Sequence, residues 1–243
     1  MFDTGPVSAV PSLTVPQLKQ IAGRSRPTVL AREQVLPVLP ALADLLPGGA
    51  LQRGTVVGVV GEAATSLALC LAAGPSTAGS WVAVFGLPTL GLAAAAEAGL
   101  ALERLVLVRE PSPSSWGPVV AALVGAFDVV LLAPAHRVRT TDARRLAARA
   151  RERGSALVQI DGQGRSSLEC DVRLTAGRVR WHGLARGHGH LQARRLEVEA
   201  TGRRRAARPR RVDLWLFDDE GGVTAAPATP EATVTPLPSQ RAG

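Results

Sequence analysis

The residues whose types and spacing are best suited to chemistry surround a glycine turn at Gly61, which lies between two apolar segments. The first segment is β-branched and the second is rich in alanine and leucine, the arrangement that carries the phosphate loop of nucleotide-binding α/β proteins, G-x-x-x-x-G-K-[ST]. Counted from Gly61, the second glycine is Ser66, the lysine is Leu67 and the magnesium-binding hydroxyl is Ala68. The sequence therefore predicts the scaffold of a phosphate loop without its chemistry, and we expect no cofactor, no metal and no catalytic residue.

Two interpretations of the Gly61 turn remain open. A helix N-terminus can hold an anion without a lysine, so a residual nucleotide pocket is one interpretation. The other is an ordinary turn between a strand and a helix. Glu62 lies directly inside the turn and would repel phosphate, which favours the ordinary turn.

Few other residues in the chain are candidates for metal binding or catalysis. His182, His188 and His190 lie in a glycine-rich segment, which favours a flexible turn over a metal site because metal binding needs further ligands in an ordered loop. A DNA-contacting loop is a further alternative, which ranks with the metal site and below the flexible turn. No G-x-S-x-G motif supports a nucleophilic triad. Cys70 and Cys170 stand singly in apolar runs, as expected for buried thiols in a reducing compartment.

The elements that would position these residues alternate between strand and helix along the first two thirds of the chain. Continuous apolar strands separated by helices are typical of a parallel sheet covered on both faces. The predicted strands are Thr55–Val60, Trp81–Phe85, Leu105–Val108, Asp128–Leu132 and Ala156–Ile160, and the predicted helices are Ala64–Ala73, Leu90–Ala98, Ser112–Gly125 and Thr141–Arg153.

After Asp161 the helical segments disappear and glycine turns separate the strands, which predicts an antiparallel extension of the sheet. These predicted strands are Cys170–Leu174, Arg178–Trp181, Leu191–Ala200 and Val212–Phe217. With 243 residues the chain can bury one core. We therefore expect a single α/β domain at 28–217, a flexible N-terminal arm at 1–27 and a disordered tail at 218–243.

The helical pattern of Thr28–Leu46 is interrupted by Pro37 and Pro40 and has two interpretations. The leucines of its part Leu36–Leu46 either dock on another protomer, which would make a homo-oligomer, or cover the chain's own sheet, the interpretation that we favour. No segment approaches the roughly 20 apolar residues of a membrane span. The beginning of the chain lacks the pattern of a signal peptide, so we expect a cytoplasmic protein.

Positive charge is concentrated in the second half of the chain. The net charge is +8, and between His136 and Arg211 there are 20 arginines and seven carboxylates. Five arginines on the predicted helix Thr141–Arg153 fit the exposed face of an amphipathic helix. The densest run is expected at a hairpin tip, where it forms either a solvated loop or a contact with phosphate or an acidic partner. That run consists of Arg203, Arg204, Arg205, Arg208, Arg210 and Arg211.

Two further features concern partners. No aromatic residues are interleaved with the arginine run, so any DNA contact would be non-specific and without base stacking. Leu214, Trp215 and Phe217 make the predicted strand Val212–Phe217 rich in large apolar residues. As an edge strand it could accept a partner.

The order of these segments resembles the core of RecA and RadA proteins. Pro47–Gly54 looks like the stretch that precedes the strand of their phosphate loop, and the later strands follow in the same order. This resemblance implies a RecA-like fold. It also implies acidic residues where Gly86-Leu87-Pro88 stands and a magnesium-orienting aspartate where Ala133 stands. With Leu67 in place of the lysine, all three parts of phosphoryl-transfer chemistry are missing, which predicts a pseudo-ATPase.

Among RecA-like proteins that lack these residues, the chain most resembles the ImuA-prime type of actinobacterial mutasome accessory proteins, through its leucine- and proline-rich entry Leu36–Gly49. The resemblance implies a DNA-damage-induced, SOS-type role in mutagenic translesion synthesis. Its implied partners are an inactive Y-family-like polymerase of the ImuB type and an error-prone replicative-type polymerase. The alternatives are a DNA-binding RecA paralogue in recombinational repair and an ATPase completed in trans.

Overall fold

The computed structural model describes residues 35–109, 113–161, 168–185, 188–203, 206–216 and 222–226. Within them, nine strands form one sheet in the order β11-β10-β9-β8-β3-β7-β6-β4-β5. The strands that alternate with helices are β3 (Val56–Val60), β4 (Val82–Phe85), β5 (Leu105–Val108), β6 (Val129–Leu132) and β7 (Ala156–Asp161). The last strands are β8 (Val172–Ala185), β9 (His188–Gly202), β10 (Arg210–Leu216) and β11 (Val223–Ala225).

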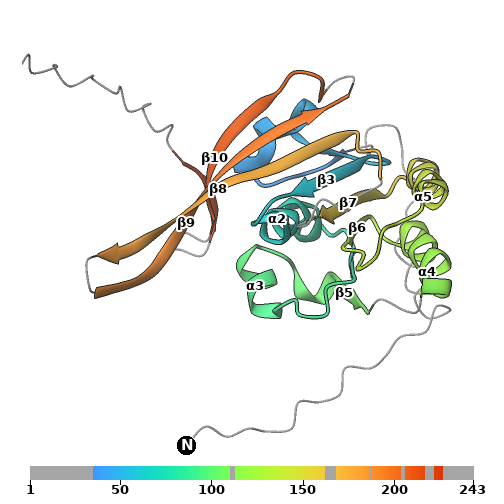
Figure 1. Ribbon diagram of the computed structural model, residues 1–243, viewed down its shortest axis with the longest axis horizontal. Coiled ribbons are helices and arrows are strands. Elements are labelled where there is room, and N and C mark those ends of the chain that lie inside the picture. The colour runs from blue at the N-terminus through green and yellow to red at the C-terminus, as the bar shows by residue number, and fades with distance from the viewer. Residues whose placement is uncertain are drawn as a thin grey trace, which may run out of the picture.

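The sheet is parallel from β8 through β3 to β5 and antiparallel from β8 to β11. Figure 1 shows α2 and α3 on one face of the parallel part and α4 and α5 on the other. The helices are α2 (Ala64–Thr77), α3 (Leu92–Glu97), α4 (Pro113–Ala126) and α5 (Thr140–Arg153). The predicted fold class, α/β with a mostly parallel sheet and antiparallel C-terminal strands, is confirmed.

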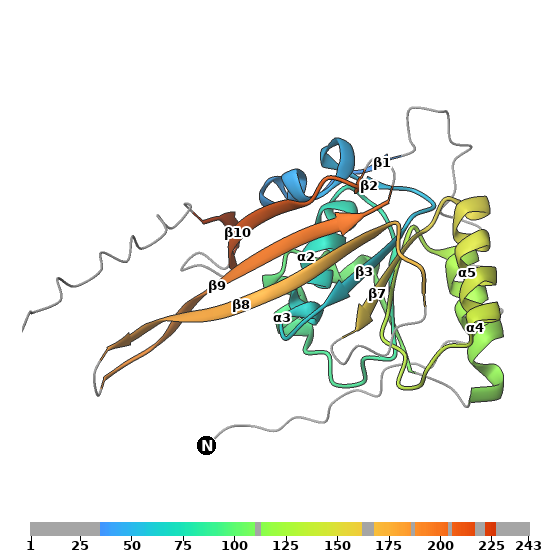
Figure 2. The ribbon, with the colours of Figure 1, turned by 45° about the horizontal axis from the view of Figure 1, so that its top comes forward.

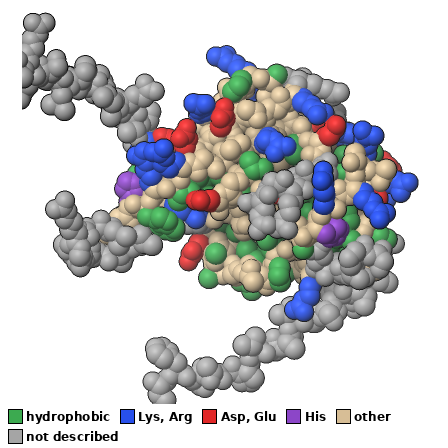
Figure 3. Space-filling view, in the orientation of Figure 1, with side chains coloured by type: hydrophobic (Ala, Val, Ile, Leu, Met, Phe, Trp, Pro, Cys, Tyr) green, Lys and Arg blue, Asp and Glu red, His purple; other side chains and the backbone are tan. Residues whose placement is uncertain are grey.

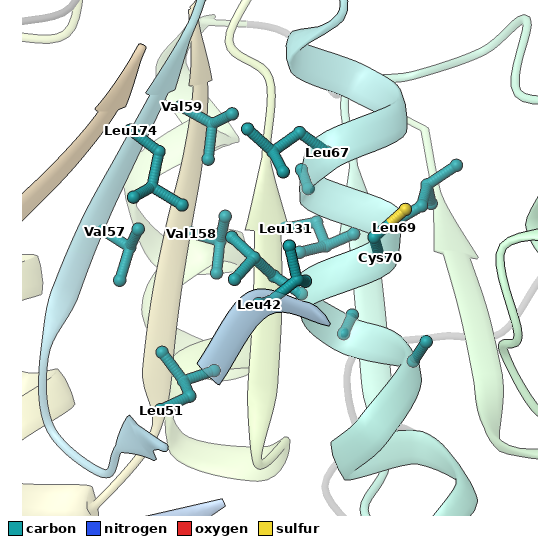
Figure 4. Packing of buried hydrophobic residues seen from close by; sticks show 14 of the residues in the cluster. Leu42, Leu51, Val57, Val59, Leu67, Leu69, Cys70, Leu131, Val158 and Leu174 are labelled. Atoms are coloured by element: carbon teal, nitrogen blue, oxygen red, sulfur yellow. The ribbon is translucent and has the colours of Figure 1, made fainter. Parts of the chain in front are cut away.

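Alternate residues of each parallel strand enter two different core clusters. In β6, Val129 and Leu131 pack under α2, whereas Val130 and Leu132 pack under α4 and α5. Because both faces are covered, every residue of this strand is buried, and the sequence shows a continuous apolar run instead of alternation. Figure 4 shows the α2 side of this core, where Leu67 of α2 and Leu131 of β6 lie between the helix and the sheet.

Four short elements outside the main sheet form the N-terminal part of the described chain. Strand β1 (Val35–Leu36) pairs with β2 (Leu51–Gln52), and two 3-10 helices, η2 (Pro40–Leu45) and η3 (Pro47–Gly49), lie between them. The predicted helical pattern is therefore wrong for the described part of Thr28–Leu46, where Pro40 begins a short 3-10 helix instead. Helix η2 packs on β10 and β11, with Leu42 and Leu45 in the core. Figure 2 shows η2, in blue, over β10, so these leucines cover the chain's own sheet.

Several element boundaries differ from the sequence-based expectation, and the physical reason is clearest for α2 and β8. Helix α2 continues through Pro75 to Thr77, because a proline in the last turn removes only one helical hydrogen bond. Strand β8 is one strand of 14 residues, not two. Gly177 lies between the predicted strands Cys170–Leu174 and Arg178–Trp181, where a glycine turn was expected. In the structure it lies at a register irregularity between Ala176 and Val179, and a β-carbon on it would approach the Glu197 carbonyl oxygen to 3.3 Å.

The predicted tail also needs correction. Strand β11 lies inside the segment expected to be disordered and pairs with β10, for example Val223 with Leu216. Strand β10 is therefore not an edge strand. A strand of three residues is too short to give a periodic pattern in the sequence. The predicted arm at 1–27 lies outside the described residues. No helix among the described residues is long and apolar enough to cross a membrane.

Candidate functional site

The loop after β3, where a phosphate loop would lie, is closed by the neighbouring strand. Gly61 has a φ of 106°, and a β-carbon on it would lie 2.2 Å from the carbonyl oxygen of Ala176 in β8. Glycine is therefore required here by the approach of two backbones. The packing of β8 alone therefore accounts for this glycine, and a phosphate-binding role is not needed to explain it.

The residues at the lysine and hydroxyl positions belong to the core. Leu67 and Ala68 are both 0% exposed. Ser66 lies half-buried on the same helical turn, and its hydroxyl accepts a 2.7 Å hydrogen bond from the Arg194 Nη2 of β9. The first turn of α2 is thus occupied by contacts within the chain.

The other two positions of phosphoryl-transfer chemistry lie at the same end of the sheet. Ala133 follows β6 and Leu87 follows β4. Both are partly buried and pack against the core cluster under α2. Neither side chain can orient a water or a magnesium ion. Among the described residues there is no group of three or more His, Cys, Asp or Glu side chains that could hold a metal.

The opposite end of the strands carries a cavity of about 390 Å³, which we call the amino-edge pocket. It opens beside Gly54 and Thr55 before β3 and Val172 at the start of β8. Leu46, Leu51 and Val57 form much of its apolar floor, and Arg151 and Arg203 lie at its mouth together with Asp171. Figure 2 shows β2, the start of β8 and α5 meeting in this region.

Two predicted basic segments meet at the amino-edge pocket. Arg151 comes from the last turn of α5, and Arg203 from the turn after β9. Arg151 Nη2 lies 3.7 Å from Asp171 Oδ1, and Arg203 Nη1 lies 3.0 Å from Glu169 Oε2. This proximity was not predictable from the sequence, because the two arginines belong to elements that are distant in the chain.

The charge around this pocket affects the titration of Glu169. The pKa of Glu169 lies below its ordinary value, first because Arg203 donates a hydrogen bond to its carboxylate. The positive charges of Arg203, Arg144 and Arg151 lower the pKa further. Three guanidinium groups therefore contribute to a positive field at this edge.

The predicted arginine run is divided between a turn and a strand. Arg203 and Arg208 lie in the turn between β9 and β10, as expected, and both are exposed. Arg210 and Arg211 are residues of β10 itself, and Arg211 Nη2 lies 3.5 Å from Glu199 Oε1 on β9. Arg204 and Arg205 lie outside the described residues.

The antiparallel part of the sheet projects from the body as a long hairpin of β8 and β9 (Figure 1). Trp181 is 54% exposed near the outer part of the hairpin, and Arg194 lies 5.3 Å from its ring centre. His182 packs edge-on against Trp215 of β10, with ring centres 4.5 Å apart. Figure 3 shows basic side chains over β9 and β10 as well as over α5. His188 and His190 begin β9, but their side chains lie outside the description.

The predicted partner-binding residues have different environments. Leu214 is 0% exposed and belongs to the core, because its side chain points to the face that η2 covers. It is therefore not available to a partner in the folded chain. Trp215 is half-buried, and Phe217 lies outside the described residues.

A second hollow, of about 570 Å³, lies between the first turns of α4 and α5. His136, Arg137 and Arg139 line it, together with Trp116 and Asp142. Trp116 is buried, and its ring packs edge-on to His136 at 5.3 Å. This basic hollow was not predicted from the sequence, although Arg137 and Arg139 immediately precede a predicted helix N-terminus, where anions are favoured.

Comparison with proteins of known sequence and structure places the chain. It is 33% identical over 195 residues to the Mycobacterium tuberculosis protein named "Uncharacterized protein Rv3395c", covering 76% of this chain and 93% of that one. The crystal structure of the RadB recombinase matches with a TM-score of 0.57 and 16% sequence identity, covering 77% of this chain and 97% of RadB. That likeness shows a RecA-like fold.

The family model of the MT3502 N-terminal domain matches residues 44–164. These residues run from η2 to just beyond β7 and include the closed loop at Gly61 and the whole of α5. Together with the identity to Rv3395c over nearly all of that protein, the match shows that the chain belongs to the MT3502 family.

Proposed function

We propose that this protein is a non-catalytic, RecA-like accessory protein of a DNA-damage-induced complex for mutagenic translesion synthesis. The observation that carries this proposal is the burial of Leu67 at the position of the phosphate-loop lysine. A RecA-like protein without the lysine and both acidic positions has no means to stabilise a transferring phosphoryl group. Its remaining role is to hold other macromolecules.

The partners we propose are an inactive Y-family-like polymerase of the ImuB type and an error-prone replicative-type polymerase. They would bind the C-terminal half, where the β8–β9 hairpin extends beyond the body (Figure 1). Trp181 presents an exposed aromatic surface there, and large aromatics are frequent anchors in interfaces. We expect the protein in the cytoplasm, gathering with these polymerases at the nucleoid after damage.

Point variants are the right test, because truncation after Ala200 would remove β10. Its Leu214 and Leu216 are both 0% exposed, so a truncated chain would lose core packing. We would recover tagged full-length protein from damage-treated cells and measure both polymerases in the eluate. Trp181→Ser is expected to lower their recovery at least about tenfold, the loss of one interface anchor.

Leu107→Ser is the matched control for Trp181→Ser. Leu107 is 45% exposed on β5, the strand at the opposite edge of the sheet. Recovery that falls with Leu107→Ser and not with Trp181→Ser would move the partner site to the β5 edge. Failure of both polymerases to co-purify with the wild-type protein, or ATP turnover by it, would contradict the proposal.

A second candidate function is direct, non-specific DNA binding by a RecA paralogue in repair. The basic hollow of His136, Arg137 and Arg139 at the start of α5 favours it. Binding of a mixed-sequence single-stranded oligonucleotide, measured by fluorescence anisotropy, would then weaken steeply with salt. It would also weaken in Arg137→Glu/Arg139→Glu, while polymerase recovery stayed unchanged.

A further inference from the structure

We propose that the amino-edge pocket is a docking site for an acidic peptide segment of a partner protein. In this arrangement an apolar side chain of the peptide enters the cavity, and neighbouring carboxylates bind Arg151 and Arg203 at its mouth. The inference goes beyond the proposed function, because it concerns the end of the sheet opposite the hairpin and does not depend on the identity of the polymerases.

The floor of the pocket is suited to an apolar anchor. Leu51 and Val57 are each 1% exposed, and Leu46 and Val172 are 3% and 5% exposed. The cavity of about 390 Å³ is within the size range of binding pockets in proteins. An apolar side chain that enters it leaves water for an apolar surface, which favours binding.

The mouth of the pocket is suited to carboxylates. The side chains of Arg151 and Arg203 are 59% and 63% exposed, so both guanidinium groups reach solvent. A guanidinium has five N–H donors, and each of these arginines has one ion pair within the described residues. The planar group can therefore also bind an incoming carboxylate through two hydrogen bonds.

Asp171 limits the pocket without neutralising it. Its Oδ2 accepts a 3.0 Å hydrogen bond from the Val56 backbone N–H, which holds the carboxylate at the base of β3. The described lining residues include Arg151, Arg203 and this one aspartate, a net charge of +1. Glu169, which pairs with Arg203, adds one negative charge, and Arg144, whose charge lowers the Glu169 pKa, adds one positive charge, so the net charge stays at +1. The chain as a whole carries +8, so the pocket and its surroundings both favour an acidic ligand.

The separation of apolar and charged groups favours a peptide over a small metabolite. A buried metabolite needs polar partners inside its site, because its own polar groups lose water there. Here the charged side chains lie at the exposed mouth and the floor is apolar. A peptide satisfies both conditions, since one side chain enters the cavity while its backbone and acidic neighbours stay at the surface.

The test uses the full-length protein and a library of random 12-residue peptides displayed on phage. Ala50→Trp fills the pocket with a large side chain at a half-buried position of its lining, and Arg151→Glu/Arg203→Glu reverses the charge of its mouth. Arg145→Glu is the matched control, because Arg145 is exposed on α5 but does not line the pocket. Thermal unfolding of each variant verifies that it is folded.

Selection on the wild-type protein is expected to enrich peptides with an apolar residue next to Asp or Glu. The selected peptide, synthesised with a fluorophore, should bind Ala50→Trp and the double reversal at least about tenfold more weakly, and Arg145→Glu within about twofold. Enriched peptides that are basic, equal binding to Ala50→Trp, or no enrichment would overturn the proposal.

A mixed-sequence oligonucleotide is the competing probe in the same assay. If it binds, loses affinity in the double reversal and no acidic peptide is enriched, the mouth binds nucleic acid and the proposal is wrong. These outcomes are independent of polymerase recovery with Trp181→Ser. The pocket and the proposed accessory function can therefore fail separately.

Discussion

The two ends of the parallel strands differ sharply in the residues that they carry. At the carboxyl end of β3, Gly61 touches the backbone of β8 and Leu67 is buried. At the amino end, the amino-edge pocket has an apolar floor and the two arginines Arg151 and Arg203 at its mouth. One end is closed by packing within the chain, and the other is open and charged.

This difference bears on a general rule for α/β proteins. Ligands bind outside the carboxyl ends of parallel strands, because loops and helix N-termini converge there. In this chain the long strand β8 lies against the turn that would receive phosphate, and Ala176 leaves no room beside Gly61. The RecA-like fold is therefore compatible with a usual ligand site that is occupied by the chain's own strand. A pocket can then form at another place on the same fold.

The largest effect should come from placing a lysine at the closed end. Leu67→Lys buries an ammonium group without a partner and is expected to lose more stability than Leu67→Ala, for which about 2–5 kcal/mol is typical. Urea denaturation of both variants measures the loss, with Leu67→Met as the conservative control. A stable Leu67→Lys protein that hydrolyses ATP would show that this end is open.

The next effect should separate backbone strain from the contact with β8. Gly61 and Gly79 both have positive φ angles, 106° and 97°, but a β-carbon on Gly79 would meet no atom within 4 Å. Gly79→Ala is expected to cost about 1–3 kcal/mol, from strain alone. Gly61→Ala should cost clearly more in the same denaturation experiment, and equal losses would mean that β8 does not close the loop.

A smaller effect is expected at the open end. Asp171→Ala leaves the buried Val56 N–H without its side-chain acceptor, a loss of about 1–3 kcal/mol. Asp171→Asn keeps an oxygen acceptor and should lose less. Equal stability of all three proteins in urea would show that Asp171 does not hold the base of β3.

The smallest effect concerns Glu169 and depends on pH. Its folded pKa lies below the unfolded value, so the ionised carboxylate stabilises the protein above about pH 4.5. That contribution disappears as the pH falls through the folded pKa. Urea midpoints of the wild type and Glu169→Gln should therefore differ slightly at neutral pH and converge in acid. A difference that grows in acid would contradict the ion pair with Arg203.

The parallel core was predictable from the sequence. Apolar runs such as the one at β6 require cover on both faces, and the residues Leu67, Ala68 and Ala133 can be read directly at their positions. This prediction succeeds because it depends on neighbours within one element. The placement of the Leu36–Leu46 leucines over their own sheet was the favoured one of two interpretations, and it depends on the packing of η2 on β10.

The amino-edge pocket, the role of β11 and the burial of Leu214 were not predictable in this way. Arg151 and Arg203 meet only because β8 lies between β3 and β9 in the sheet. Leu214 is buried only because η2, from the other end of the chain, packs on β10. The sequence determines which segments are strands and helices and which chemistry they lack. Tertiary structure decides which distant side chains share a surface, because strand order and packing bring together segments that have no local influence on one another.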